Sequence, residues 1–444
     1  MATTTITAVS KVQLSPEHLG VYRVPNISAG SLEEANRLLQ KNHDEIHMFW
    51  RDANGHNHTV HNILTSLALG ATPTELQQAF DDTARDQVRA KPDPDPKVVQ
   101  DLYNADVFYA NLGSGKQYPN FLAFFEQEIE NKGWQAVLNE YCFSRSRNAE
   151  ALLARLFEGA YHSIIHVGLG VEFKQPSIIA EGLAQAAGDG AQGLEGFFHD
   201  SDKLVDSASQ PLAELLHEAY SNETIHRAAK WEDGPNKIRA GVLGRAGDEI
   251  AQLAAKLRIK PDELQQRTAE MISCVAYMAT AAQRRGKLRK IDFFYMHNVT
   301  SSIFLTVLTR QDFIKLEDRV RLLEYKGRSD LVWYAACGAP KLQVEDVASY
   351  GNGASAGMNW DQLFRAINEM HDDGHVAKFV RALKSGEEVS KGLEENNAGF
   401  PIKGDLWLKA AQMAYATILD LPGDQKWLFF AGFDQAWAGV ASTA

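Results

Sequence analysis

The stretch that decides the fold is NAEALLARLFEGAYHSIIHVGLG, residues 148–170. Its first half repeats leucine and phenylalanine at the three- and four-residue spacing of an amphipathic helix, and Asn148 is the expected N-cap. Its second half places His162 and His166 four residues apart, so that on a helix the two imidazoles share one face. The stretch therefore predicts packed helices that present histidine pairs.

Helical signals recur on both sides of this stretch. Capping boxes begin runs at residues 31–34 and 72–75, the second with proline at the first helical position. Residues 261–285 and 361–383 keep the 3.6-residue period, and the length and neighbours of the apolar run 293–296 favour helix as well. Strands would need a two-residue alternation bounded by hairpin turns, of which there is little. We therefore expect an all-α protein.

Domain organisation is read from composition and punctuation. No internal repeat or shift of composition divides the chain, so we expect one large helical domain over residues 1–444, with its core in 30–440. A loop is expected near 91–96, where three alternate prolines exclude a helix. A second loop is expected near 187–196, which is rich in glycine.

Composition and charge exclude several kinds of partner. Hydrophobic residues make up 45% of the chain, enough to bury a core, and 57 acidic against 45 basic residues give a net charge of −12, which disfavours nucleic acid. No apolar run reaches the length of a membrane span and the N-terminus has no apolar core, so we expect a cytoplasmic protein that does not enter a membrane. Cys142, Cys274 and Cys337 lie far apart, which predicts neither a disulfide framework nor a cysteine zinc site. These features leave the oligomeric state open.

Two short motifs lack the context that their chemistry needs. Gly351, Gly353 and Gly357 follow no apolar strand, so a surface loop is favoured over a nucleotide-binding turn. Two Glu-x-x-His motifs, at 214–217 and 223–226, match the spacing used in di-iron bundles, but nine helical steps come to about 900° and place them on opposite faces. Without a break between them, polar residues on a solvated face are the expected reading.

The remaining candidates are histidines. The chain has 14, and seven of them fall in four short apolar segments. His58 and His61 are three residues apart and share a helical face, as His162 and His166 do. Histidine is the commonest metal ligand and suits iron, zinc, copper and nickel. A core histidine bonded to a backbone carbonyl is the alternative for each, above all for the lone His297. Together the clusters predict a nitrogen-rich metal site between helices.

One lysine lies in an apolar helical stretch. Lys378 follows His375 by three residues, within residues 376–380. Burial would lower the pKa of its amine, and a neutral amine can react with carbon dioxide to give a carbamate, an anionic oxygen ligand. The alternatives are a lysine that extends to solvent or one that forms an ordinary salt bridge.

The four histidine segments together resemble the questin oxidase-like family of fungal polyketide pathways. The resemblance runs over roughly residues 30–440, and the order of the segments is more specific than any one of them. The matching segments are Asn57-His58-x-x-His61 with residues 67–71, His162-x-x-Ile165-His166-x-Gly-x-Gly170-x-Glu172-Phe173, Asp292-Phe-Phe-x-Met-His297-x-Val-Thr-Ser-Ser302, and His375-Val-x-Lys378 with residues 381–383.

This resemblance implies oxidative cleavage of an anthraquinone ring. Some members of the family are NADPH-dependent Baeyer–Villiger oxidases, and one branch consists of non-haem iron dioxygenases whose iron is held by four histidines and a carboxylated lysine. If this chain resembles that branch, the iron ligands would be His58, His162, His166, His297 and Lys378. His61 and His375 would then be catalytic side chains beside the metal or alternative ligands. The choice between His58 and His61 stays open.

The implied cofactors are Fe(II) and carbon dioxide, held as the Lys378 carbamate, and the implied partners are molecular oxygen and a polycyclic aromatic quinone. Phe293, Phe294 and Met296 are the aromatic and sulfur side chains nearest to His297 in sequence, and they would stack on a flat quinone or else form plain core. The missing dinucleotide fingerprint favours iron over NADPH. Two alternatives remain: an NADPH-dependent Baeyer–Villiger monooxygenase, and a helical scaffold with a structural zinc ion.

Overall fold

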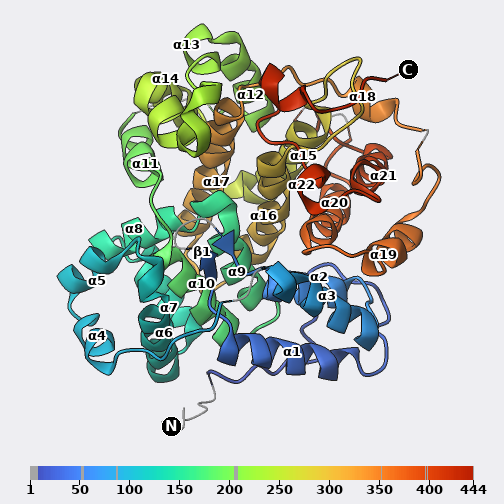
Figure 1. Ribbon diagram of the computed structural model, residues 1–444. Coiled ribbons are helices and arrows are strands. Elements are labelled where there is room, and N and C mark those ends of the chain that lie inside the picture. The colour runs from blue at the N-terminus through green and yellow to red at the C-terminus, as the bar shows by residue number, and fades with distance from the viewer. Residues whose placement is uncertain are drawn as a thin grey trace. The chain divides into compact units, whose positions relative to one another are not determined.

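The computed structural model describes residues 9–51, 55–86, 89–204, 209–351, 353–395, 397 and 399–443. Within these ranges the secondary structure is helical from α1 (Ser31–Glu45) to α22 (Gly423–Lys426), apart from one short antiparallel pair, β1 (Phe49–Arg51) and β2 (Gly55–His56) (Figure 1). The prediction of an all-α protein is confirmed. None of the described helices combines the length and the apolar character that crossing a membrane requires. The expectation about the N-terminus falls largely on residues 1–8, outside the described ranges.

Contacts divide the chain into two compact units, each made of segments that are separate in sequence. The first unit consists of Met1–Ala191, Arg310–Ile314 and Phe364–Lys378. The second consists of Gln192–Thr309, Lys315–Leu363 and Phe379–Ala444.

The first unit holds all but one of the predicted site histidines. Its continuous N-terminal part contains, in chain order, α1, β1, β2, α2 (Thr59–Ala68), α3 (Pro73–Asp86), α4 (Pro96–Asp101), α5 (Ala105–Asn111), η1 (Gly115–Gln117), α6 (Tyr118–Lys132), α7 (Trp134–Leu138), η2 (Asn139–Phe143), α8 (Arg147–Arg155), η3 (Gly159–Tyr161), α9 (His162–Glu172) and α10 (Pro176–Gly188).

Two glycines let α9 and α10 pack unusually close together. A Cβ atom at Gly182 would lie 2.6 Å from the backbone nitrogen of Val167, and one at Gly170 would lie 2.7 Å from that of Ile179. Real Cβ atoms do not approach a backbone that closely, so any side chain at either position would force the helices apart. This contact brings the buried polar residues of α10 against the histidines of α9.

Helix starts follow the predicted chemistry in one place and depart from it in two. At α3 the capping box is present, since Glu75 Oε2 accepts from the Thr72 nitrogen at 2.6 Å and Thr72 Oγ1 accepts from the Glu75 nitrogen at 3.3 Å. The capping box at Ser31 is wrong, because Gly30 is the N-cap and the Ser31 hydroxyl donates to the Ala71 carbonyl. Asn148 is not the cap of α8 either, because Ser146 accepts from the Ala149 nitrogen there.

The prediction of one helix over 361–383 is also wrong. α19 (Trp360–Asn368) ends before a turn and α20 (His375–Ser390) begins after it. Gly374 has a φ of 90°, which favours glycine, and the Asp372 carboxylate accepts from the backbone nitrogens of Gly374 and Val376. The turn therefore caps α20 and sets the position of His375 in its first turn.

Two other boundaries are narrower than expected. The loop predicted at 187–196 is confined to 189–193, since α10 extends to Gly188 and α11 begins at Leu194. The loop predicted at 91–96 ends where Pro96 starts α4, with the Asp95 carboxylate as its N-cap.

The second unit is helical as well. Its elements are α11 (Leu194–Lys203), α12 (Leu212–Ser221), α13 (Glu223–His226), η4 (Trp231–Asn236), η5 (Lys237–Val242), α14 (Leu243–Ala255), η6 (Pro261–Glu263), α15 (Leu264–Ala281), α16 (Phe293–Thr309), α17 (Leu316–Ala336), α18 (Glu345–Ala348), the first part of α19, the later part of α20, α21 (Leu406–Ile418), α22 and η7 (Asp434–Trp437). The helix predicted over 261–285 ends at Ala281, and the apolar run 293–296 is helical as expected.

Candidate metal centre

His58 lies directly before α2, in a turn held by Asn57. The Asn57 amide donates to Asn42 Oδ1 at 2.6 Å, and its oxygen accepts from the Thr59 nitrogen at 2.9 Å. Both contacts are buried, so the turn has little freedom. It fixes His58 at the start of α2 and His61 in the first turn of that helix.

His162 opens α9 after three residues with left-handed backbone. Gly159, Ala160 and Tyr161 have φ values of 54°, 51° and 65°. For a non-glycine residue this conformation costs of order 1–3 kcal/mol and persists only where the surroundings enforce it. The turn directs the Gly159 carbonyl at His162 Nδ1, at 2.6 Å. A carbonyl only accepts, so Nδ1 carries the proton, and Nε2 of the neutral ring is a lone pair.

His375 opens α20 and is held in the same way by a carboxylate. Its Nδ1 donates to Asp373 Oδ1 at 2.6 Å. This bond leaves Nε2 of the neutral ring without a proton. A carboxylate behind an imidazole fixes the ring's orientation and raises its strength as a ligand, which is the usual arrangement around protein-bound metals.

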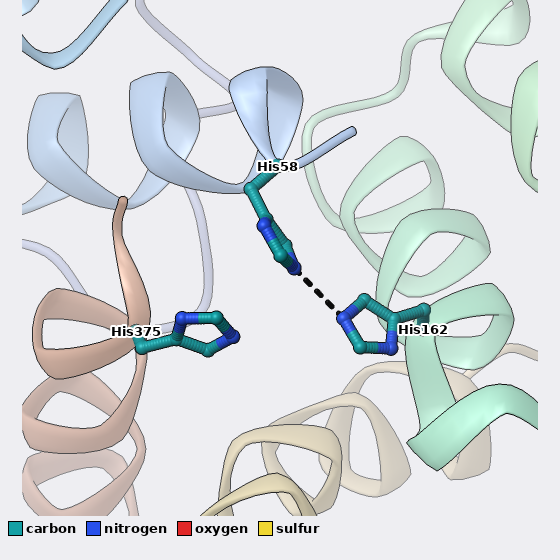
Figure 2. A group of neighbouring side chains, drawn as sticks. All are labelled: His58, His162 and His375. Atoms are coloured by element: carbon teal, nitrogen blue, oxygen red, sulfur yellow. Dashed lines mark hydrogen bonds between the residues drawn. The ribbon is translucent and has the colours of Figure 1, made fainter. Parts of the chain in front are cut away.

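The three helix starts bring His58, His162 and His375 together, as Figure 2 shows. We call these three residues the imidazole group. One ring nitrogen of each lies within 4.8 Å of one ring nitrogen of both others, and all three side chains are buried. His58 Nε2 and His162 Nε2 are 2.8 Å apart. The group is the one cluster of three or more histidine, cysteine or carboxylate side chains with metal-binding geometry in the described ranges.

The imidazole group fits a transition-metal ion. The 2.8 Å between His58 Nε2 and His162 Nε2 is short enough for both nitrogens to hold one ion at the usual metal–imidazole distance of about 2.0–2.1 Å. Since Nε2 of His162 is a lone pair, the short contact needs either a proton on His58 Nε2 or a cation shared by both rings.

Electrostatics keep the His58 ring neutral and therefore available as a ligand. Burial, followed by the charge of Lys378, holds the pKa of His58 well below its ordinary value. Asp373, on the far side of the His375 ring, supplies a negative charge. Burial raises its pKa, but contact with His375 outweighs burial and holds the pKa of Asp373 well below its usual range. If three neutral imidazoles bound a divalent ion, the one carboxylate would offset only part of its charge. Further ligands would have to offset the rest.

His61 and Lys378 lie beside the imidazole group. Lys378 Nζ is 3.4 Å from His61 Nδ1, and Nε2 of His61 is buried with no hydrogen-bond partner among the described residues. Burial, followed by Lys378, holds the pKa of His61 well below its ordinary value. Burial lowers the pKa of Lys378 to about 8, although Asp373 opposes that shift. The lysine is thus easily neutralised, and the snorkelling alternative is wrong, because the side chain is buried.

His166 belongs to a second set of groups, buried except for the half-buried Glu126, which we call the carboxylate chain: Glu126, His43, Glu181 and His166. His166 Nε2 donates to Glu181 Oε2 at 2.8 Å, and His43 donates to Glu181 at 2.6 Å and to Glu126 at 2.9 Å. The ring of His166 lies 5.2 Å from that of His61, and its Nδ1 is buried with no described hydrogen-bond partner. That nitrogen is a further donor that a metal ion could use.

The carboxylate chain contains charged groups, whereas His58 of the imidazole group is neutral. Burial lowers the pKa of His43, but hydrogen bonds to Glu126 and Glu181 outweigh it and raise the pKa to about 9. Burial likewise raises the pKa of Glu181, but its bonds to His166 and His43 lower it to about 2. His43 is therefore an imidazolium and Glu181 a carboxylate at neutral pH.

The other predicted site residues lie in the second unit. His297 is in α16, buried, with Nδ1 2.7 Å from the Phe293 carbonyl. Phe293 stacks on Phe429 with ring centroids 4.8 Å apart, and Phe294 stacks on Trp333 at 4.6 Å. Met296 is buried.

Sequence reasoning missed the acidic partners. Asp373 and Glu181 were not singled out, nor was Asp189, which contacts His56 Nε2 at 2.8 Å, while the His56 ring stacks on that of His162. Glu181 is a lone charge in an apolar helix, the same signal that identified Lys378, and could have been found by it. Asp373 carried no such signal.

The fold and the site define a class: an all-α protein with a buried, histidine-based candidate metal centre. Comparisons with known proteins identify the family. The family model described as questin oxidase-like matches residues 55–383. A Baeyer–Villiger oxidase of Pestalotiopsis fici is 54% identical over 438 residues, 98% of each chain. Questin oxidase of Aspergillus terreus is 49% identical over 439 residues, again 98% of each chain. A Baeyer–Villiger monooxygenase of a Cryptosporiopsis species is 49% identical over 97% of this chain and 98% of that one.

The chain belongs to the questin oxidase-like family, and the resemblance inferred from its sequence is confirmed. The match contains every histidine of the imidazole group as well as Lys378.

Proposed function

We propose that this chain is an oxidoreductase that cleaves a ring of a polycyclic aromatic quinone, with molecular oxygen as oxidant and ferrous iron as cofactor. Its relatives are named as oxidases, which supports the reaction class. The observation that carries the metal is the imidazole group, three buried imidazoles with ring nitrogens within 4.8 Å of one another. Bound ferrous iron would supply the redox chemistry that lets oxygen react with an aromatic ring.

The chain's own residues would hold and orient that site. His58, His162 and His375 would be ligands, while the Gly159 carbonyl and Asp373 keep the Nδ1 protons of His162 and His375 in place. Burial excludes bulk water and keeps the His58 imidazole neutral. His375 thus moves in our proposal from an alternative ligand to a ligand.

The wider ligand set remains part of the proposal. Lys378 would carry carbon dioxide as a carbamate, supported by its burial and by a pKa lowered to about 8 through that burial. A carbamate would add the negative charge that neutral imidazoles lack. With His58, His162 and His375 as ligands, His166 or His297 would be the fourth histidine, and His61, whose Nε2 has no hydrogen-bond partner among the described residues, would be a catalytic side chain or replace one of the ligands.

The substrate proposal rests on aromatic side chains. Phe293 and Phe294 form a cluster with Phe429 and Trp333, and Phe429 is 44% exposed. A flat quinone offers a large π-face that such rings can stack on.

The three cysteines are buried free thiols, in keeping with the reducing cytoplasm as the proposed location.

A second candidate function is an NADPH-dependent Baeyer–Villiger monooxygenase, which the printed names of several relatives favour. The two reactions differ in stoichiometry. A dioxygenase places both atoms of one oxygen molecule in the product and takes the electrons from the substrate. A monooxygenase inserts one atom and reduces the other to water with one NADPH.

Turnover of a panel of hydroxyanthraquinones under ¹⁸O₂ separates these reactions. We expect two ¹⁸O atoms per ring-opened product and no stoichiometric loss of NADPH, with no product from His162→Ala. One ¹⁸O atom and one NADPH consumed per product would establish the monooxygenase instead. Absence of product from every quinone, in protein loaded with iron, would refute the quinone substrate.

A further inference from the structure

Buried polar side chains follow one side of helix α10: Glu181 and Gln185 lie within the helix, and Asp189 lies directly after its last residue, Gly188. They are four residues apart, so successive members lie on nearly the same helical face. The outer two are occupied, since Glu181 bonds to His166 and His43, and Asp189 bonds to His56 and, at 3.1 Å, to the Ser163 hydroxyl. All three side chains are no more than 3% exposed.

Gln185, in the middle, differs from its neighbours. It is fully buried, and neither Nε2 nor Oε1 has a hydrogen-bond partner among the described residues. Leaving a buried polar atom unpaired costs about 1–3 kcal/mol, and an amide leaves two. An apolar residue of similar size would avoid that cost, so the amide indicates a partner other than the described residues.

The packing of α9 against α10 sets where this amide lies. The two helices run antiparallel, with Val167 against Gly182 and Gly170 against Ile179. Glu181 bonds to His166 of α9, and Asp189 bonds to His56, whose ring stacks on that of His162. Gln185, one helical turn from each, therefore lies between these two contacts, on the side of α10 that faces the helix carrying His162.

We propose that Gln185 binds the oxygen atoms of the substrate, with Nε2 donating to a ring ketone and Oε1 accepting from an adjacent ring hydroxyl. This inference rests on the proposed function and assigns a residue that orients the quinone. An amide presents a donor and an acceptor side by side, which matches a neighbouring ketone and hydroxyl pair. A few such polar groups in an otherwise apolar site fix the orientation of a flat ligand that stacking alone leaves free.

The test measures binding without turnover. As-purified protein is titrated under nitrogen with 1-hydroxyanthraquinone and with 1-methoxyanthraquinone, which lacks the hydroxyl proton, and tryptophan quenching gives the dissociation constants. Wild type should prefer the hydroxy compound by about tenfold or more, because a polar site rejects an analogue that leaves its groups unpaired. Gln185→Leu should lose that preference. The matched control is Ser177→Ala, which removes a buried hydroxyl of the same helix that also has no hydrogen-bond partner among the described residues. This variant should keep the preference for the hydroxy compound.

Melting temperature supplies a second readout. Because the amide has no hydrogen-bond partner among the described residues, Gln185→Leu should melt at or above the wild-type temperature. Gln185→Met, which is unbranched and of similar length, repeats both measurements should the leucine variant misfold.

Each other outcome decides against the inference. An unchanged preference in a folded Gln185 variant would mean that the amide contacts only water, and the proposed function would still stand. A preference lost equally in Ser177→Ala, or a melting temperature lowered in both Gln185 variants, would make the amide a structural group. Binding of neither compound by wild type would refute this inference and the quinone substrate together.

Discussion

The imidazole group and the carboxylate chain both place buried histidines in the first unit, yet one histidine of each differs in charge. His43 is charged, and His58 is neutral. His43, in the carboxylate chain, donates to two carboxylates, and its pKa is raised to about 9. His58, in the imidazole group, is equally buried, but its Nδ1 lies 3.9 Å from Asp373 Oδ2, beyond hydrogen-bond distance. Burial then dominates and holds the pKa of His58 well below its ordinary value.

The difference teaches that the number of carboxylates in direct contact, rather than burial, decides what a buried histidine can do. An imidazolium with both nitrogens bonded is a structural cation and offers no lone pair. A neutral imidazole held from behind through Nδ1 offers Nε2 to a metal ion. Glu181 and Asp373 are the residues that sort the histidines into these two roles, so substitutions of each test the comparison.

The largest effect is expected from Glu181→Gln. This change leaves the His43 imidazolium with one carboxylate and converts a buried charged pair into an unbalanced charge. Breaking a buried pair costs about 3–5 kcal/mol, so the free energy of unfolding in urea should fall by that amount. Glu223→Gln breaks an ion pair with Arg227 in which both side chains are about 75% exposed, and should change stability by less than about 0.5 kcal/mol. Equal effects of the two variants would show that Glu181 is not ionised.

A slightly smaller effect is expected from pH. Because the pKa of folded His43 is about 9 and that of the unfolded residue about 6.5, its contribution is complete below pH 6.5 and is lost as pH rises through 9. Up to about 3 kcal/mol of unfolding free energy should be lost over that range. Urea unfolding at pH 6.5 and pH 9 should show this loss in wild type and a clearly smaller loss in His43→Gln. Parallel losses in both proteins would mean that His43 is neutral.

The smallest effect is expected from Asp373→Asn. The amide cannot supply the negative charge that orients His375, so affinity for Fe(II) should fall by about 10–100-fold, with little change in fold. The control is Asp82→Asn, which removes the partner of the exposed His371 and should leave metal affinity unchanged. Competition with a metal-binding dye measures both constants. An unaltered affinity in Asp373→Asn would exclude His375 as a ligand.

Much of the fold could be predicted from sequence, because helical periodicity and turn chemistry are local. The capping box at Thr72 and the helix at 293–296 are examples. The break at 369–374 was missed because the apolar period continues through it, although Asp372 and Gly374 carry the capping signal. Ser31 was misread because its hydroxyl bonds to Ala71, forty residues away, which no local pattern reveals.

The candidate site divides in the same way. The histidine pairs are visible as spacings, which single out His162 and one of His58 and His61, whereas His375 belongs to no pair and enters only through the resemblance. Their convergence depends on three separate helix starts, and the left-handed turn before His162 carries no sequence signature beyond one glycine. The contact between Glu181 and His43 spans 138 residues, so only the packed structure could reveal which histidines are charged.

The most direct test of the central claim is the iron content of purified protein. Elemental analysis should find about one iron per chain in wild type and in His371→Ala, whose exposed histidine lies outside the imidazole group. His162→Ala should retain less than a tenth of that iron, because it removes one ligand and the nitrogen that faces His58. Full iron occupancy in His162→Ala, or zinc in place of iron in active wild-type protein, would contradict the assignment of the imidazole group as an iron site.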